Sequence, residues 1–215
     1  MAQQNQKQSW IVLKFGGTSV STKENWQIIK NIVMKKIQTG KKILLVHSAL
    51  SGVSNLLEKL IDRAIKDEYE VILKEIQQRH QSLCRELGLN EEMVLPGYFS
   101  NLERLIKGIH LLGDLNPKIH ARIMSLGELI STTMGFHYLK KNFGENIKTG
   151  WLDARSVLKA DSDNSDPSHY LETASKFESS KQIQNRLNLM GDVVITQGFI
   201  ASNNTDETVL LGRGG

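Results

Sequence analysis

The sequence predicts an α/β fold built on a mainly parallel β-sheet. Two short apolar runs, residues 10–15 (WIVLKF) and 42–47 (KILLVH), predict buried strands. The segment between them has helical periodicity. A strand, a helix and a second strand joined by short loops favour parallel pairing through a right-handed crossover. A third strongly apolar run, residues 192–200 (DVVITQGFI), predicts a further strand late in the chain.

The first helix is expected to follow a glycine-rich loop. Thr22 can cap its start, and Gly40 is a stop signal just after its expected end near Thr39. Its apolar residues recur at helical spacing, at Trp26, Ile29, Val33 and Ile37. Residues 1–9 are polar, so we expect a disordered tail there and folded structure over residues 10–215.

Residues 54–142 are helical in pattern almost throughout. The breaks in this pattern fall near Asp67, at 88–97 and at 113–117. The last helix, expected at 117–141, carries an apolar stripe of Ile119, Ile123, Leu126, Ile130 and Met134. Its other side has small residues at a spacing of four, Gly127, Ser131 and Gly135. We expect this helix to be packed on both sides. Glu128, beside the small residues, then needs a partner, because burying an unpaired carboxylate is costly.

The last third of the chain alternates strands and loops. The expected elements are a strand at 147–151, a surface loop at 160–168, a helix at 175–189, a strand at 192–200, and a turn at 203–206 into a strand at 208–211. The sequence then ends in a glycine-rich loop, Gly212–Gly215. From this ending we expect the natural protein to be longer.

The composition is close to that of a soluble globular protein. Hydrophobic residues make up 40% and charged residues 23% of 215 positions, enough for one ordinary domain or two small ones. The net charge of +4 is dispersed over separate lysine pairs. Nucleic-acid binding needs a concentrated basic face or a known reading module, so we expect no nucleic-acid partner.

Cysteine usage and hydropathy point to the cytoplasm. Cys84 is the single cysteine, has no partner for a disulfide, and is expected to be buried or half-buried. The first ten residues contain no apolar signal core. No stretch approaches the roughly 18 apolar residues of a membrane span, so we expect no membrane partner.

The strongest local signal follows the first strand. Lys14 ends that strand and is followed by Gly16, Gly17, Thr18 and Ser19. Glycines let backbone N–H groups approach phosphate oxygens, and the lysine supplies a positive charge, so this cluster suits a phosphate site. The GxxxxGK[ST] pattern of a Walker A loop is absent. A simple tight turn remains the alternative.

Two further clusters follow later strands. Residues 48–54 (SALSGVS) lie after the second strand, where open α/β sheets bind ligands, although Ser51 or Ser54 can equally cap the next helix. Residues 196–200 (TQGFI) and 212–215 (GRGG) place an arginine between glycines, which can clamp a carboxylate. An exposed loop arginine is the alternative.

No metal site is expected. Asp161, Asp163, Ser165 and Glu172 have the spacing of an EF-hand loop, but Asp166 replaces its glycine. The histidines show no metal spacing, and His47 is interpreted as a hydrogen-bonded structural residue rather than a site residue. No GxSxG elbow supports hydrolase chemistry.

Taken together, the motifs resemble the aspartokinase branch of the amino acid kinase family. They are residues 12–20 (VLKFGGTSV), 125–132 (SLGELIST), 151–155 (WLDAR), and 196–202 (TQGFIAS) with 211–215 (LGRGG). The resemblance implies a three-layer αβα sandwich with a mainly parallel sheet, of the amino acid kinase or carbamate kinase type. Residues 10–215 would form its amino-terminal, substrate-binding part and stop where the nucleotide-binding half begins.

The resemblance also implies a role for each matching position. Lys14 would be the catalytic lysine, in contact with the transferring phosphoryl group. The phosphate site would consist of Lys14, Gly16, Gly17, Thr18, Ser19, Gly214 and Gly215. The substrate site would consist of Ser54, Glu128, Phe199 and Arg213. Within it, Glu128 would accept the amino group and Arg213 the α-carboxylate. The segment 47–51 (HSALS) departs slightly from the family pattern.

The implied reaction transfers the γ-phosphate of ATP, with Mg²⁺ on its phosphates, to the β-carboxylate of L-aspartate. The product, 4-phospho-L-aspartate, starts lysine, threonine and methionine biosynthesis. A carboxylate with a pKa near 4 is already ionised at pH 7, so no general base is needed. The family resemblance also implies a homodimer. Because the nucleotide-binding half is missing, we expect the isolated 215 residues to be inactive.

Two alternatives stay open. One is another amino acid kinase, acting on acetylglutamate or glutamate. The other is a non-catalytic binding or assembly module, which apolar exposure on the helices between Tyr98 and Leu112 would support. A dinucleotide-dependent oxidoreductase is excluded by the missing GxGxxG motif.

Overall fold

A four-stranded, all-parallel sheet forms the centre of the computed structural model, which describes residues 9–66, 68–160, 167–174 and 180–212. The strands are β1 (Trp10–Phe15), β2 (Lys42–His47), β3 (Thr149–Trp151) and β4 (Val193–Gln197). Their order is β1-β2-β4-β3, and each neighbouring pair is parallel. The predicted parallel sheet is therefore confirmed. The expected tail lies outside the described residues, except for Ser9.

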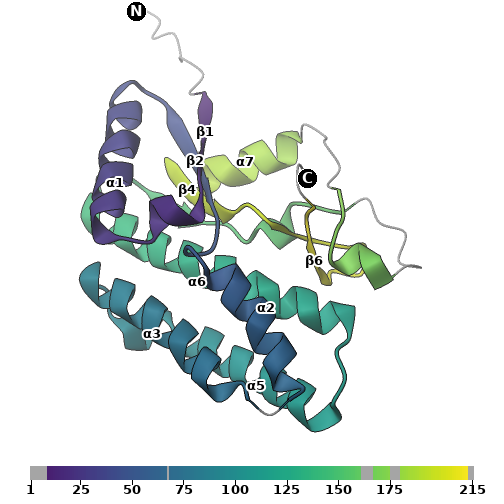
Figure 1. The fold of residues 1–215 in the computed structure, drawn as a ribbon. Coiled ribbons are helices and arrows are strands. Elements are labelled where there is room, and N and C mark those ends of the chain that lie inside the picture. Colours follow the sequence, from purple (N-terminus) through teal and green to yellow (C-terminus); the bar gives the residue numbers. More distant parts are fainter. Residues whose placement is uncertain (1–8, 67, 161–166, 175–179, 213–215) are drawn as a thin grey trace, which may run out of the picture.

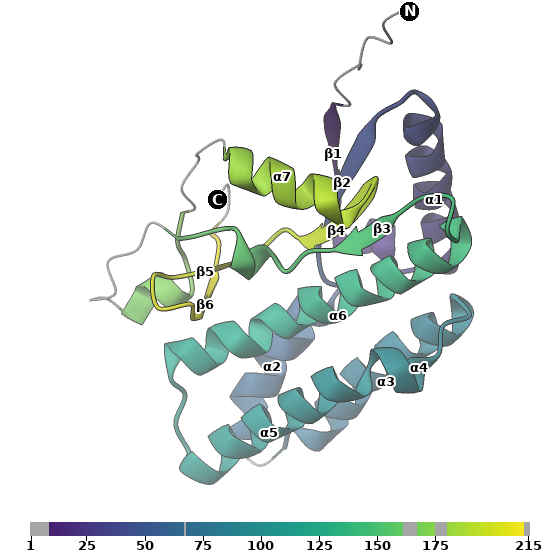
Figure 2. The same cartoon turned by 180° about the vertical axis from the view of Figure 1, so that it is seen from behind.

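Helices cover both faces of this sheet, which gives the expected three layers. Helices α1 (Lys23–Gln38) and α6 (Pro117–Phe143) lie on one face, and α7 (Lys181–Met190) lies on the other (Figure 2). The remaining helices pack beyond α6, as Figure 1 and Figure 2 together show, and are α2 (Val53–Ala64), α3 (Glu70–Glu86), α4 (Glu91–Val94) and α5 (Pro96–Leu112). No helix among the described residues is long and apolar enough to cross a membrane.

Helix α1 forms where the sequence predicts it. The Thr22 hydroxyl accepts the Asn25 N–H at 3.2 Å, which caps the first turn. Trp26, Ile29 and Val33 are buried against the sheet, and Gly40 follows the last turn with φ of 76°.

Helix α6 is buried on all sides over its middle part. Every residue from 123 to 132 is buried. The small residues lie where other elements come closest: a Cβ on Gly127 would lie 3.0 Å from the Ala49 Cβ, and one on Gly135 would lie 2.4 Å from Trp26. The predicted packing on two sides is confirmed, and Glu128 is buried on this helix.

Strand β1 was predicted to be buried, but it is partly exposed. It is the edge strand of the sheet, and Val12 is 61% exposed. Only β2 and β4 have neighbours on both sides, and they bury Ile43, Leu45 and Ile195 completely. An apolar run indicates a strand but not its place in the sheet, because the neighbours of a strand come from segments far away in the chain.

The predicted strand at 192–200 is in fact two elements. Strand β4 ends at Gln197, and Ile200–Ser202 forms β5, which pairs antiparallel with β6 (Thr208–Leu210). The chain turns at Gly198 and Phe199, and the N–H groups of both residues donate to the Glu128 side chain instead of to a neighbouring strand.

Two smaller boundaries also differ. Helix α7 begins at Lys181 with Ser180 as its cap, and residues 175–179 of the predicted helix lie outside the described part. The short helix α4 lies inside the predicted break at 88–97. Most of the predicted loop at 160–168, with the EF-hand-like positions Asp161, Asp163 and Ser165, lies outside the described residues.

Candidate functional site

Three predicted clusters meet at the carboxyl ends of the parallel strands. Phe15 of β1 pairs with His47 of β2, and His47 pairs with Gln197 of β4. The loops that follow these three residues therefore begin at the same edge of the sheet. This edge is where α/β sheets bind ligands.

The first two of these loops are hydrogen-bonded to each other. The Ser21 hydroxyl donates to the Gly17 carbonyl at 2.6 Å and accepts the Ser51 N–H at 2.8 Å. A Cβ on Gly17 would lie 2.7 Å from the Ala49 carbonyl oxygen, whereas one on Gly16 would meet nothing within 4 Å. Gly17 is thus required for the close approach of the loops. Ser21 was not predicted as a site residue, although it directly follows the motif at 12–20.

The predicted polar residues of these loops face outward. Lys14, Gly16, Thr18 and Ser54 are exposed, and Ser19 is half-buried. Ser54 lies in the first turn of α2, but neither it nor Ser51 caps that helix. The N-cap is Gly52, with φ of 77° and no side-chain hydrogen bond, so the predicted serine cap is wrong. The Ser51 N–H is instead committed to Ser21.

Glu128 is the buried acid of the site. It is 4% exposed, and its Oε2 accepts the N–H groups of Gly198 and Phe199, both at 2.8 Å. Burial raises the pKa of this carboxyl to about 7, against the opposing effect of these N–H groups, the charge of Lys14 and the Ala49 backbone. The partner that Glu128 requires is therefore the turn after β4. The end of β1, through Lys14, and the loop after β2, through Ala49, also act on this carboxylate.

The β5–β6 hairpin brings the end of the described chain to this turn. The Leu211 N–H donates to the Phe199 carbonyl at 2.8 Å. Glu207, which precedes β6, hydrogen-bonds to Lys118 of α6, to Tyr170 and to Asn203. These three bonds lower the pKa of its carboxyl to about 2. The hairpin is thereby tied to the helix that carries Glu128. Arg213, Gly214 and Gly215 lie outside the described residues.

His47 is buried and hydrogen-bonded, as expected. It is fully buried, with Nδ1 3.1 Å from the Ser48 carbonyl and its ring edge-on to Trp26 at 5.3 Å. Burial lowers its pKa to about 4. Cys84 is buried, also as expected.

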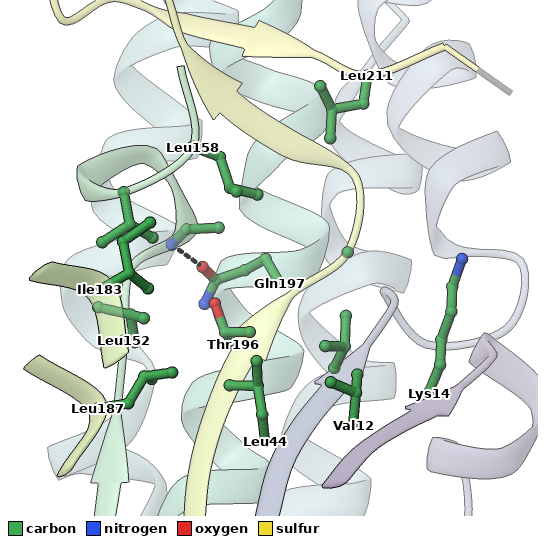
Figure 3. Close-up of a pocket in the computed structure, with 14 residues that line it drawn as sticks. Val12, Lys14, Leu44, Leu152, Leu158, Ile183, Leu187, Thr196, Gln197 and Leu211 are labelled. Carbon is green, nitrogen blue, oxygen red and sulfur yellow. Dashed lines mark hydrogen bonds between the residues drawn. The ribbon is translucent and has the colours of Figure 1, made fainter. Parts of the chain in front are cut away.

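An apolar cavity of about 330 Å³ lies on the sheet face opposite α6. Figure 3 shows Lys14 at one end of this cavity and Ile183 and Leu187 of α7 at the other. Val12 and Leu44 lie between them. Among the described residues no group of three or more His, Cys, Asp or Glu side chains could hold a metal ion.

Comparison with known proteins gives a consistent result. A family-wide sequence model, that of the amino acid kinase family, matches residues 9–215. An aspartokinase of Chlamydia pneumoniae is 34% identical over 213 residues, covering 96% of this chain and 42% of that protein. A bifunctional aspartokinase/homoserine dehydrogenase of Buchnera aphidicola is 31% identical, covering 95% of this chain and 25% of that protein.

A solved structure resembles the fold over almost the whole chain. The crystal structure of E. coli aspartokinase III in complex with aspartate and ADP superimposes with a TM-score of 0.79 at 26% identity. The match covers 97% of this chain and 44% of the other. The chain thus spans less than half the length of each of these relatives.

Proposed function

This chain belongs to the amino acid kinase family, and we propose that the full-length natural protein is an aspartate kinase. The observation that carries the proposal is Glu128, a buried carboxylate at the carboxyl edge of the sheet, close enough for the charge of Lys14 to act on it. A site of this kind suits a small molecule with both an ammonium group and carboxylates. The similarity to aspartokinases supports the choice of aspartate.

In the proposed reaction a β-carboxylate oxygen of L-aspartate attacks the γ-phosphorus of Mg-ATP. A new P–O bond forms, the bond to the β,γ-bridging oxygen breaks, and ADP leaves with that electron pair. Because the attacking carboxylate is already ionised at pH 7, the protein has to position and neutralise charge rather than remove a proton. Mg²⁺ would be held mainly by the phosphates of the nucleotide.

We assign the roles as follows. Lys14 neutralises the transferring phosphoryl group, and the backbone of Gly16 and Gly17 approaches the phosphates. Glu128 accepts the substrate ammonium. The remaining assignments are Thr18, Ser19, Gly214 and Gly215 to the phosphate site, and Ser54, Phe199 and Arg213 to the substrate.

The electrostatics of Glu128 fit this role. Burial raises the pKa of its carboxyl to about 7. A bound ammonium group would lower that pKa, because an opposite charge favours the ionised form. Substrate binding and ionisation of Glu128 are therefore expected to reinforce each other.

The test is acyl phosphate formation by the full-length natural protein, trapped with hydroxylamine in the presence of Mg-ATP. We expect a signal with L-aspartate and none with L-glutamate or N-acetyl-L-glutamate. The last compound lacks an ammonium group and so tests the role of Glu128 as well. A signal only with N-acetyl-L-glutamate would overturn both the substrate and the assignment of Glu128.

The assembly alternative has one observation in its favour. Leu111 and Leu112, at the end of α5, are 71% and 81% exposed. An exposed apolar pair of this kind is compatible with the homodimer that the family resemblance implies, and the dimer remains a prediction. The molar mass of the same preparation by light scattering tests it.

A further inference from the structure

A buried hydrogen-bond network begins at the backbone carbonyl of Glu128 and connects α6 with the ends of β3 and β4. The Thr132 hydroxyl donates to the Glu128 carbonyl at 2.8 Å, with the Leu129 carbonyl at 3.3 Å. It accepts the Gln197 Nε2–H at 2.7 Å and the Trp151 Nε1–H at 3.1 Å. The Gln197 Oε1 accepts the Ala154 N–H at 2.8 Å, the bond drawn as a dashed line in Figure 3.

The donors and acceptors of this network leave one arrangement. The Ala154 N–H needs an acceptor, so the Gln197 amide must turn Oε1 toward it and Nε2 toward Thr132. An indole N–H only donates, so Trp151 takes the second lone pair of the hydroxyl. The hydroxyl hydrogen of Thr132 can then point only to the carbonyl of its own helix. Thr132 and Gln197 are 0% and 1% exposed, so water offers no substitute partners.

Glu128 is consequently held at two points by one short segment. Its backbone carbonyl is tied through Thr132 to Gln197. Its side-chain oxygen is tied to the N–H groups of Gly198 and Phe199, the next two residues. The network also joins three segments that carry the family motifs, on α6, at the end of β3 and at the end of β4. Its members are neither charged nor exposed, so they would not bind substrate themselves.

We propose that Thr132 and Gln197 are positioning residues, which set the place of the Glu128 carboxylate and thereby the affinity for the amino group of the substrate. This proposal rests on the proposed function of Glu128. Loss of either side chain would let α6 and the end of β4 shift relative to each other. The N–H groups of Gly198 and Phe199 would then meet Glu128 less well.

Two variants and one matched control test the proposal in the full-length natural protein. Thr132→Val removes the hydroxyl with almost no change of shape, and Gln197→Met fills a similar volume without the amide. Thr133→Val is the control, because Thr133 is the next residue of α6 but bonds to Tyr98 of α5, at 2.8 Å. Thr132→Ser restores the hydroxyl.

The kinetic result expected is an effect on one substrate only. Thr132→Val and Gln197→Met should each raise KM for the amino acid about tenfold, the scale of one buried hydrogen bond lost with its partner unpaired. KM for ATP and kcat should change less than about threefold, which is below the cost of leaving one buried donor or acceptor unpaired. Thr133→Val should match the unchanged protein, and Thr132→Ser should recover most of the affinity.

A second readout does not depend on activity. The pKa of the Glu128 carboxyl can be followed by NMR of protein labelled with ¹³C in the glutamate carboxyls, with Glu128→Gln to identify the resonance. Weaker N–H bonds favour the ionised form less, so Thr132→Val and Gln197→Met should raise this pKa above that of the unchanged protein. Thr133→Val should leave it unchanged.

The outcomes separate the two proposals. If the unchanged protein rejects L-aspartate while Thr132→Val still raises the pKa of Glu128, the positioning role stands and the proposed function fails. If Thr132→Val and Thr133→Val behave alike in KM and in this pKa, the positioning role is wrong. Gln197→Met carries the test alone if Thr132→Val does not fold.

Discussion

At the scale of single residues, Glu128 combines two demands that normally conflict. Its carboxylate is buried, which favours the neutral acid, yet the proposed role needs its negative charge. The N–H groups of Gly198 and Phe199 and the charge of Lys14 reduce this conflict without removing it, since the pKa stays near 7. Glu128 therefore makes the unbound protein less stable, a cost that bound substrate would offset.

This conflict predicts how Glu128→Gln changes stability with pH. Burial raises the pKa of the Glu128 carboxyl from 4.5 to about 7 in the folded protein. The neutral acid therefore stabilises the folded protein, relative to the ionised form, fully below pH 4.5, and this stabilisation is lost as pH rises through 7. Glu128→Gln should thus gain stability relative to the unchanged protein by roughly 3 kcal/mol between pH 4.5 and 7.5. Urea unfolding at several pH values measures the difference.

The same substitution is expected to weaken the binding of L-aspartate. Glu128→Gln should raise KM for L-aspartate by roughly 100-fold, because a buried charge pair is lost. A variant that is no more stable at pH 7.5 than at pH 4.5, relative to the unchanged protein, would contradict the raised pKa.

At the scale of secondary structure, α6 is the element on which the site depends. It lies against the sheet on one side and against α2 and α5 on the other, so it has no solvent-facing side over its middle turns. Small residues make this possible. Gly135 allows Trp26 of α1 and His47 of β2 to approach the helix axis.

We predict that Gly135→Ala destabilises the protein by 1–3 kcal/mol or more. Its Cβ would lie 2.4 Å from Trp26 and 2.8 Å from the His47 Nε2, and both rings are fully buried and cannot swing away. Gly108→Ala on α5 is the matched control, since nothing lies within 4 Å of its Cβ. That control should stabilise by about 0.5–1 kcal/mol through helix propensity. Equal effects in urea unfolding would refute the close approach.

At the scale of the whole molecule, acid stability depends on buried histidines. His47 and His80 are fully buried, and burial lowers the pKa of each from 6.5 to about 4. Among the described residues, Nε2 of either ring finds no hydrogen-bond partner. Both rings are therefore neutral in the folded protein at pH 7, and acid must charge them as the chain unfolds.

We predict that His80→Leu reduces the loss of stability in acid. Because burial lowers the pKa of His80, its neutral ring stabilises the folded protein fully above pH 6.5. This stabilisation, roughly 3 kcal/mol for one histidine, is lost as pH falls through 4. The unchanged protein should lose this amount on acidification, and His80→Leu should not. Glu128→Gln serves as the opposite control, because its advantage grows as pH rises. An unchanged acid dependence in His80→Leu would show that His80 does not titrate as a buried neutral ring.

The fold was predictable because periodicity and stop signals are local. Residues 10–15 and 42–47 form the strands expected, and the helix after Thr22 starts and ends where its cap and glycine indicate. Buried runs of apolar residues can form only a few structures when short loops join them. The small-residue face of α6 also indicated double packing before any contact was known.

The site was predictable only in part. Residue types singled out Lys14, Gly16, Gly17 and Glu128 as candidates. They gave no role to Ser21, nor to Thr132 and Gln197, although the last two lie within the motifs. Threonine and glutamine are common in cores and on surfaces alike. Their importance here comes from what each hydroxyl or amide meets, which depends on distances between segments far apart in the chain.

The sequence by itself determined the succession of strands and helices along the chain, the cap and stop of α1, and the need of Glu128 for a partner. Only the tertiary structure decided that β1 lies at the sheet edge, that the run at 192–200 breaks after Gln197, and that this break supplies the partner. The physical reason is the range of the interactions. Hydrophobic period and backbone preference act within a few residues, whereas hydrogen bonds between Glu128 and the turn after β4 join positions 70 and 71 residues apart.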